Sequence, residues 1–172
     1  MQLKVKSKAF YPSHGAGWVK RKKNIEFNGE KKKYFEFEFI NNPLTISTPI
    51  DNIDNLGIRS INPKKIIKGA MTTLKRRKTK KIDTKDFNTI INTLKDLEET
   101  GDIGCFVEII QHCNYIIKER EKEGRLIPVS IEKQLDNACG NIAGEWAVAS
   151  DIAYEKAKKT FEKTTGIEMK DD

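Results

Sequence analysis

The stretch IEFNGEKKKYFEFEF, residues 25–39, decides the fold of the N-terminal part of the chain. Asn28-Gly29 is a strong signal for a two-residue hairpin turn, because both central positions of a type I′ turn need positive φ. Phenylalanines then alternate with polar residues from Phe35 to Phe39, which is typical of a strand with one apolar face. The stretch therefore predicts a β-hairpin.

Other short strands are predicted on both sides of this hairpin. Ala9 to Tyr11 is a brief apolar run, the glycine-rich turn SHGAG (residues 13–17) follows it, and a strand through Trp18 comes next. Another alternating strand runs from Leu44 to Thr48 and ends at a proline. Several short strands in so few residues favour a small, strongly bent barrel of the SH3 or Tudor kind.

The sequence after residue 62 has helical periodicity. Asn62-Pro63 is typical of a helix cap followed by a first turn, and Asp83 or Thr84 is expected to cap the next helix. Further helices are expected to begin near residues 102, 130 and 150, and three glycines mark helix ends: Gly101, Gly124 and Gly166. Short loops between such helices favour an antiparallel bundle. We therefore expect an α+β protein with two domains, a small SH3/Tudor-like β-barrel at residues 1–61 and an all-α helical bundle at residues 62–172.

The charge of the chain is unevenly distributed. The net charge is +4 in residues 1–54, +10 in the acid-free residues 55–82, and −7 in residues 83–172. The densest run is LKRRKTKK at residues 74–81, in a basic linker that we place at residues 74–82. A like-charged run gains little from folding, so we expect it to neutralise nucleic-acid phosphates, unless it is only a solvated loop. Six cations form the run: Lys75, Arg76, Arg77, Lys78, Lys80 and Lys81.

The cysteines suggest packing rather than chemistry. The chain has 3 of them, Cys105, Cys113 and Cys139, and all lie in apolar helical contexts. A zinc site that combines them with His112 is the alternative, but the close ligand pairs of structural zinc sites are missing. We therefore expect buried free thiols and no metal.

The sequence carries no enzyme signature. Phosphate-binding glycine loops, G-x-S-x-G and H-E-x-x-H are absent. Ser13 and His14 are adjacent among glycines, yet adjacent side chains on an extended segment point apart, and a turn explains them more simply. Glu36 and Glu38 are interpreted as a solvated or partner-facing strip. We expect no catalytic residue, no cofactor and no small-molecule substrate.

The composition indicates a cytoplasmic protein. The charged fraction is 33%, and no stretch approaches the ~20 apolar residues of a membrane-spanning helix. The N-terminal segment has no continuous apolar block, so we expect no signal peptide and no membrane partner.

Several motifs in order resemble the RNA-polymerase-interacting domain shared by CarD proteins and transcription-repair coupling factors. They are the YP-x-HG turn, the NGE-x-x-x-Y hairpin, the LT-x-x-x-P-x-DN strand end and the LG-x-R exit, in segments KAFYPSHGAGWV, IEFNGEKKKYFEFEF and LTISTPIDNIDNLGIRSI. The helical part resembles CarD in its basic linker, in an aromatic residue that opens a helix, and in ASDIAYEKAKKTFEKTTG near the end. No helicase motifs follow the N-terminal segment, so we expect a stand-alone regulator.

The resemblance implies two partners. The N-terminal domain would dock on the β-subunit lobe of bacterial RNA polymerase, and the helical domain would reach promoter DNA at the upstream edge of the transcription bubble and modulate open-complex stability. The strand that contains Ile46 and starts at Leu44 is expected to offer an edge for strand addition. Some CarD proteins carry arginines for the polymerase where this chain has Ile25 and Ser47.

The DNA side of the resemblance concerns a wedge and a lysine. CarD proteins place a tryptophan wedge where this chain has Phe87, followed by basic residues where it has Asn88, Thr89 and Ile90. Phe87 either acts as this wedge or simply opens the buried stripe of its helix. Lys133 falls where the family presents a DNA-contacting lysine. The lost arginines and gained lysines also favour an alternative, a stand-alone duplex DNA-binding protein with little sequence preference and reduced polymerase contact.

Overall fold

The computed structural model describes residues 3–83 and 85–170, and its first half is an antiparallel sheet. The hairpin predicted at Asn28-Gly29 joins β2 (Gly15–Phe27) to β3 (Glu30–Phe39), and both turn residues have positive φ, 52° and 79°. The remaining strands are β1 (Lys8–Tyr11), β4 (Thr45–Pro49) and β5 (Arg59–Ser60), with the 3-10 helix η1 (Ile50–Asn52) after β4.

The predicted barrel is not confirmed, because the sheet is open. Its strand order is β4-β3-β2-β1-β5, so β4 and β5 are the two edges. β5 is only 2 residues long and pairs with β1 alone among the described strands. A strand this short offers too few hydrogen bonds to close the sheet onto β4.

The two faces of the sheet pack against different things. Tyr11, Val19 and Phe37 point to one face and form a cluster of their own with Ile53 and neighbouring apolar residues. On the other face Phe10 and Ala16 join the core of the helices, and the ring of Phe10 packs on that of Phe106 at 5.6 Å. The alternation of side chains along β1 therefore ties one strand to both cores.

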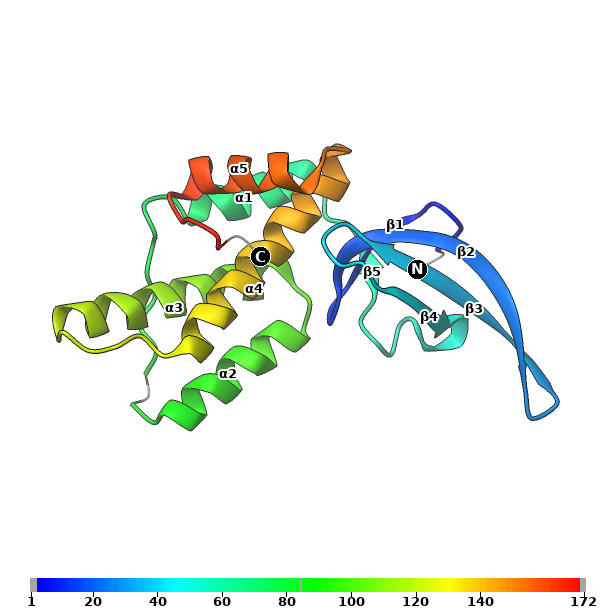
Figure 1. Cartoon of the computed structure of the whole chain (residues 1–172), viewed down its shortest axis with the longest axis horizontal. Helices are drawn as coiled ribbons and strands as arrows, with labels where there is room; N and C mark the ends of the chain where they lie inside the picture. The colour runs from blue at the N-terminus through cyan, green and yellow to red at the C-terminus, as the bar shows by residue number, and fades with distance from the viewer. Residues whose placement is uncertain (1–2, 84, 171–172) are drawn as a thin grey trace.

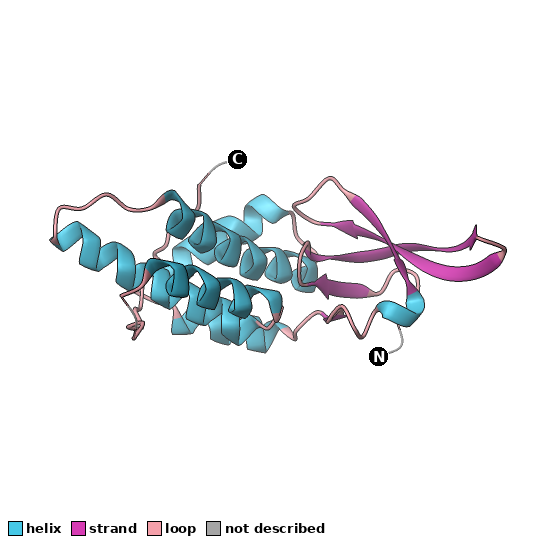
Figure 2. Cartoon of the chain, turned by 90° about the horizontal axis from the view of Figure 1, so that it is seen from below, coloured by secondary structure: helices cyan, strands magenta, loops and turns pink. Residues whose placement is uncertain are grey.

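The second half of the molecule is an all-helical bundle, as predicted (Figure 1). The helices are α1 (Lys64–Thr73), α2 (Phe87–Glu99), α3 (Ile103–Lys122), α4 (Val129–Ser150) and α5 (Tyr154–Thr165). Figure 2 shows them stacked beside the sheet, with the end of the β2–β3 hairpin pointing away from them. The division into domains at residue 62 stays a prediction.

Two of the predicted helix caps were wrong. Asn62 does not cap α1, because its side chain donates instead to the carboxylate of Glu145, at 2.9 Å. α2 is capped by Asp86, which accepts from the backbone N–H of Thr89 at 2.9 Å, rather than by Asp83; Thr84 lies outside the described residues. The helix start expected near residue 102 and the helix end expected at Gly166 are confirmed, with Asp102 as the N-cap of α3 and Gly166 as the C-cap of α5.

A buried ion pair fixes the sheet against the bundle. The guanidinium of Arg59 on β5 donates to both carboxylate oxygens of Glu145 on α4, at 2.6 and 3.0 Å, and Glu145 is 0% exposed. Arg59 also donates to the carbonyl of Gly101 at 2.8 and 2.9 Å and lies 4.3 Å from the centre of the Phe10 ring. Because every polar atom of the carboxylate has a donor, the charge is tolerated inside the protein.

Candidate nucleic-acid and polymerase interfaces

The basic linker follows the surface of α3 in a defined path. The backbone N–H of Lys80 donates to the carbonyl of Gln111 at 3.0 Å, and the Nδ1 of His112 lies 2.9 Å from the carbonyl of Lys80. The side-chain amide of Asn114 donates to the carbonyl of Lys78 at 3.3 Å. The linker is therefore held to α3 in part by hydrogen bonds of its own backbone.

Two of the six predicted linker cations have structural partners. Lys80 forms an ion pair with Glu108, and this hydrogen bond together with the nearby charge lowers the pKa of that carboxylate. The Nε of Arg77 donates to the carbonyl of Gly166 at 2.8 Å, at the C-terminal end of α5, where a cation is favourable. These two side chains therefore anchor the linker to the helices.

The other four linker cations are exposed. None of them forms an ion pair within residues 3–83 and 85–170. Arg76 and Arg77 have positive φ, 61° and 50°, a strained conformation for residues other than glycine that the anchors maintain. We call these four residues the free linker cations: Lys75, Arg76, Lys78 and Lys81.

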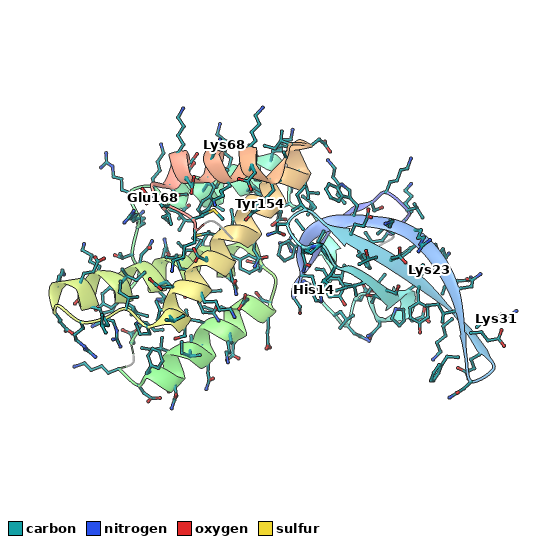
Figure 3. The ribbon with its side chains drawn as sticks, in the orientation of Figure 1. His14, Lys23, Lys31, Lys68, Tyr154 and Glu168 are labelled. Atoms are coloured by element: carbon teal, nitrogen blue, oxygen red, sulfur yellow. The ribbon has the colours of Figure 1, made fainter. Side chains whose placement is uncertain are left out.

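A second basic surface, which the sequence reasoning missed, lies on α1 and α5. The two helices pack side by side although α1 ends at Thr73 and α5 begins only at Tyr154 (Figure 1). Figure 3 shows Lys68 on the outer side of this pair. The spacing of the lysines by three or four residues on each helix was the available signal, since it places them on one helix face. This lysine ridge consists of six exposed residues: Lys64, Lys65, Lys68, Lys156, Lys159 and Lys163.

Phe87 is exposed, as its interpretation as a wedge requires. It is the first residue of α2 and retains 37% of its surface, whereas the buried stripe of the helix is made by Ile90 and Leu94. By the resemblance, CarD proteins carry a basic residue at the position of Ile90. Ile90 is buried in this chain, which explains why the residue at this position is apolar. Lys133 is exposed on the first turns of α4. Contact of either residue with DNA stays a prediction.

On the sheet, two of the predicted polymerase contacts share one face. Ser47 pairs with Glu36 across β4 and β3, and Ile25, on β2, points to the same face and is 36% exposed. Ile46 pairs with Phe37 and packs from the opposite face against the sheet's own cluster. Leu44 precedes β4 and is 57% exposed. β4 is an edge strand, as strand addition requires.

The interpretation of Glu36 as part of a solvated strip was wrong. Glu36 is 4% exposed, and its carboxylate accepts from Arg21 at 2.9 and 3.2 Å and forms an ion pair with Lys23. Two cations that flank it on β2 cover it, since side chains on neighbouring strands meet across the sheet. Glu38 is half-buried and pairs with Lys20.

The SHGAG turn lies at a cleft of about 690 Å³ between the sheet and the helices. His14 contacts the rings of Tyr11 and Phe39, with centroids at 4.9 and 5.5 Å, and burial lowers the pKa of its imidazole. A side chain at Gly17 would overlap the carbonyl of Glu38, so this glycine is required for the close approach of β2 to β3. The turn therefore has a structural explanation.

The cysteines are free, and two of the three are buried. Burial raises the pKa of the Cys113 thiol to about 12, and burial also raises that of Cys139. Cys105 is only half-buried, contrary to expectation. Within residues 3–83 and 85–170 no group of three metal-ligating side chains is placed to hold an ion. In the same residues, no helix combines the length and apolar character needed to cross a membrane.

Comparison with known proteins agrees with this geometry. Residues 3–62 match the model of the CarD-like/TRCF RID domain, which spans the whole sheet from before β1 to just after β5. The chain is also 27% identical over 151 residues to a Bacillus subtilis (strain 168) protein named "Putative transcription factor YdeB". That similarity covers 88% of this chain and 94% of the relative, so it includes the helices. The sheet therefore matches the CarD-like/TRCF RID domain, and the chain as a whole is similar to a protein that is named a putative transcription factor.

Proposed function

We propose that this protein binds bacterial RNA polymerase through the sheet and promoter DNA through the basic surfaces of the helices, and that it acts without catalysis. The observation that carries the proposal is the presence, in one chain, of a match to the CarD-like/TRCF RID domain and of a basic linker with four exposed free cations.

The polymerase contact is assigned to β4 and to the sheet face that carries Ser47 and Ile25. An edge strand has unpaired backbone groups that another strand can bind, and this needs no particular side chain. The absence of arginine at positions 25 and 47 is therefore compatible with docking on the β-subunit lobe. Exposed Leu44 lies where it would flank the added strand.

The DNA contact is assigned to the free linker cations, the lysine ridge and Lys133. Among the residues that the structure describes, none of these side chains forms an ion pair with an acid, so they are available to replace counterions on phosphates. Phe87 follows the linker and is exposed, so it supports a wedge role at the upstream edge of the bubble, with consequences for open-complex stability.

An alternative is a duplex DNA-binding protein that acts without polymerase. The lysine ridge favours it, because it enlarges the phosphate-binding surface beyond the linker. A pull-down of purified polymerase, and of its β lobe alone, by the full chain separates the two. Capture of both supports the first proposal, and DNA binding without capture of either supports the alternative.

A further inference from the structure

The far end of the β2–β3 hairpin carries a row of lysines on one face. Residues 20–33 contain seven cations and two acids. Lys22 pairs across the strands with Phe35 of the apolar cluster, so it points to the same face as that cluster. By the alternation of β3, Lys31 and Lys33 point there too. All three are exposed, and we call them the hairpin row.

The hairpin row is not used inside the molecule. The ion pairs of the hairpin lie elsewhere: Arg21 and Lys23 hold Glu36 on the opposite face, and Lys32 pairs with Glu30 at 3.7 Å. No ion pair involves Lys22, Lys31 or Lys33 in the described part of the chain. Within β2 and β3 as the structure describes them, the acid on this face of the hairpin end is Glu26, which pairs across the strands with Lys31. The hairpin row therefore has an excess of positive charge with no internal partner.

We propose that the hairpin row is a second duplex-DNA contact, which binds the phosphate backbone independently of the linker. Charge complementarity carries the assignment, since local basic density without acids attracts a polyanion. Residues two apart on a strand are separated by about 6.6–6.8 Å, so the row extends along the hairpin rather than forming one point charge.

Duplex DNA fits this face better than a single strand does. Binding of unpaired bases relies on exposed aromatic rings for stacking. Phe35 on this face is only 5% exposed, whereas Phe27, which is 72% exposed, points to the opposite face together with Ile25. The face thus offers cations without a stacking platform, which suits backbone contacts that are insensitive to sequence.

The hairpin row and the linker are well separated along the long axis of the molecule. Figure 3 shows Lys31 near the far end of the hairpin, and Figure 1 shows the segment between α1 and α2 on the other side of the bundle. The two surfaces cannot contact the same few phosphates. One protein would therefore contact two separated stretches of duplex.

The test measures the salt dependence of duplex binding for the full chain and for variants. Each lysine that neutralises a phosphate contributes about 0.9 to the slope of log affinity against log salt concentration. The triple variant K22Q/K31Q/K33Q should flatten the slope by up to ~2.7. The matched control K32Q/K95Q/K122Q removes three charges from exposed lysines outside the row and should change it little. Circular dichroism checks that both remain folded.

The outcomes separate this inference from the proposed function. A linker variant that lacks its free cations is measured in parallel. If the salt slope of duplex binding flattens in the linker variant but is unchanged in K22Q/K31Q/K33Q, the hairpin assignment alone is overturned. The reverse result supports the hairpin and argues against the linker. If K22Q/K31Q/K33Q keeps the DNA slope but loses capture of the polymerase β lobe, the row binds protein, and the duplex assignment is wrong. A greater loss on single strands than on duplex would equally overturn it.

Discussion

Arg59 and Glu145 form a bidentate ion pair that joins the last strand of the sheet to α4, across 86 positions of sequence. Asn62 completes the coordination of the carboxylate with its backbone and side-chain N–H groups, at 2.7 and 2.9 Å. The exit of the chain from the sheet is therefore fixed by one buried acid of the bundle.

Loss of Arg59 should be strongly destabilising. Arg59→Met leaves the fully buried charge of Glu145 without its counter-ion, and breaking a buried pair in this way costs about 3–5 kcal/mol of unfolding free energy. The double variant R59M/E145Q removes the uncompensated charge and should recover part of the loss, as measured by urea denaturation. Additive losses in the double variant would contradict a coupled pair.

The free linker cations should set the salt dependence of duplex binding. Replacing Lys75, Arg76, Lys78 and Lys81 with Ala should flatten the log–log slope by up to ~3.6 and weaken all sequences about equally. Lys80→Ala is the contrasting variant, because this lysine already pairs with Glu108. It should flatten the log–log slope by less than the ~0.9 expected of a lysine that neutralises a phosphate. Equal effects per residue at both places would show that the ion pair opens on binding.

Phe87 should act on the melted promoter rather than on folding. Since it retains 37% of its surface, Phe87→Ala should shift the melting temperature little. Loss of one aromatic stack, about 1–3 kcal/mol, should shorten the open-complex lifetime roughly ten- to a hundredfold, while Phe87→Trp should match or lengthen it. Duplex affinity should remain constant across the series. A large thermal destabilisation of Phe87→Ala without a kinetic defect would identify a packing residue.

Proline substitutions in the edge strand β4 test whether this strand docks on polymerase. On an antiparallel edge strand, successive residues direct their backbone N–H groups alternately toward the neighbouring strand and toward solvent. One of Ile46→Pro and Ser47→Pro should therefore remain folded and lose binding to the β lobe, since proline has no N–H. Ser47→Ala is the side-chain control and should bind normally. If both proline variants fold and bind, the docking surface is elsewhere.

Glu108 should make the linker path sensitive to acid. Its folded pKa lies below the usual 4.5, because Lys80 donates to it and the charges nearby favour the ionised form. The stabilisation is fully present above that usual value and is lost as the pH falls through the lower folded pKa. The amide signal of Lys80 in NMR spectra should then move toward its position in Glu108→Gln. A signal that is indifferent to pH below 4.5 would show that the backbone hydrogen bonds alone hold the linker.

Local chemistry allowed the hairpin and most helix ends to be predicted, because a turn at Asn28-Gly29 or a stop at Gly166 depends on adjacent residues. The barrel was not predictable in the same way, since closure depends on whether β5 reaches β4. The cap at Asn62 failed for a related reason: a buried carboxylate from α4 competes for its side chain.

In the candidate site, too, features that depend on adjacent residues could be predicted from the sequence, and features that depend on distant residues could not. The linker run was visible as a contiguous block, but only the structure separates Arg77 and Lys80, which anchor it, from the residues that remain available. The lysine ridge joins helices that are distant in sequence, and the burial of Glu36 depends on side chains of another strand.

The packing of Phe10 connects the sheet to the helices. Its ring is 0% exposed within the core of the helices, while its backbone belongs to the RID sheet, and Arg59 covers it. The proposed polymerase-binding surface and the proposed DNA-binding surfaces therefore belong to parts of the chain that pack directly against each other. The distance between the two surfaces would then be fixed by the packing at Phe10. A displacement of one surface would therefore move the other with it.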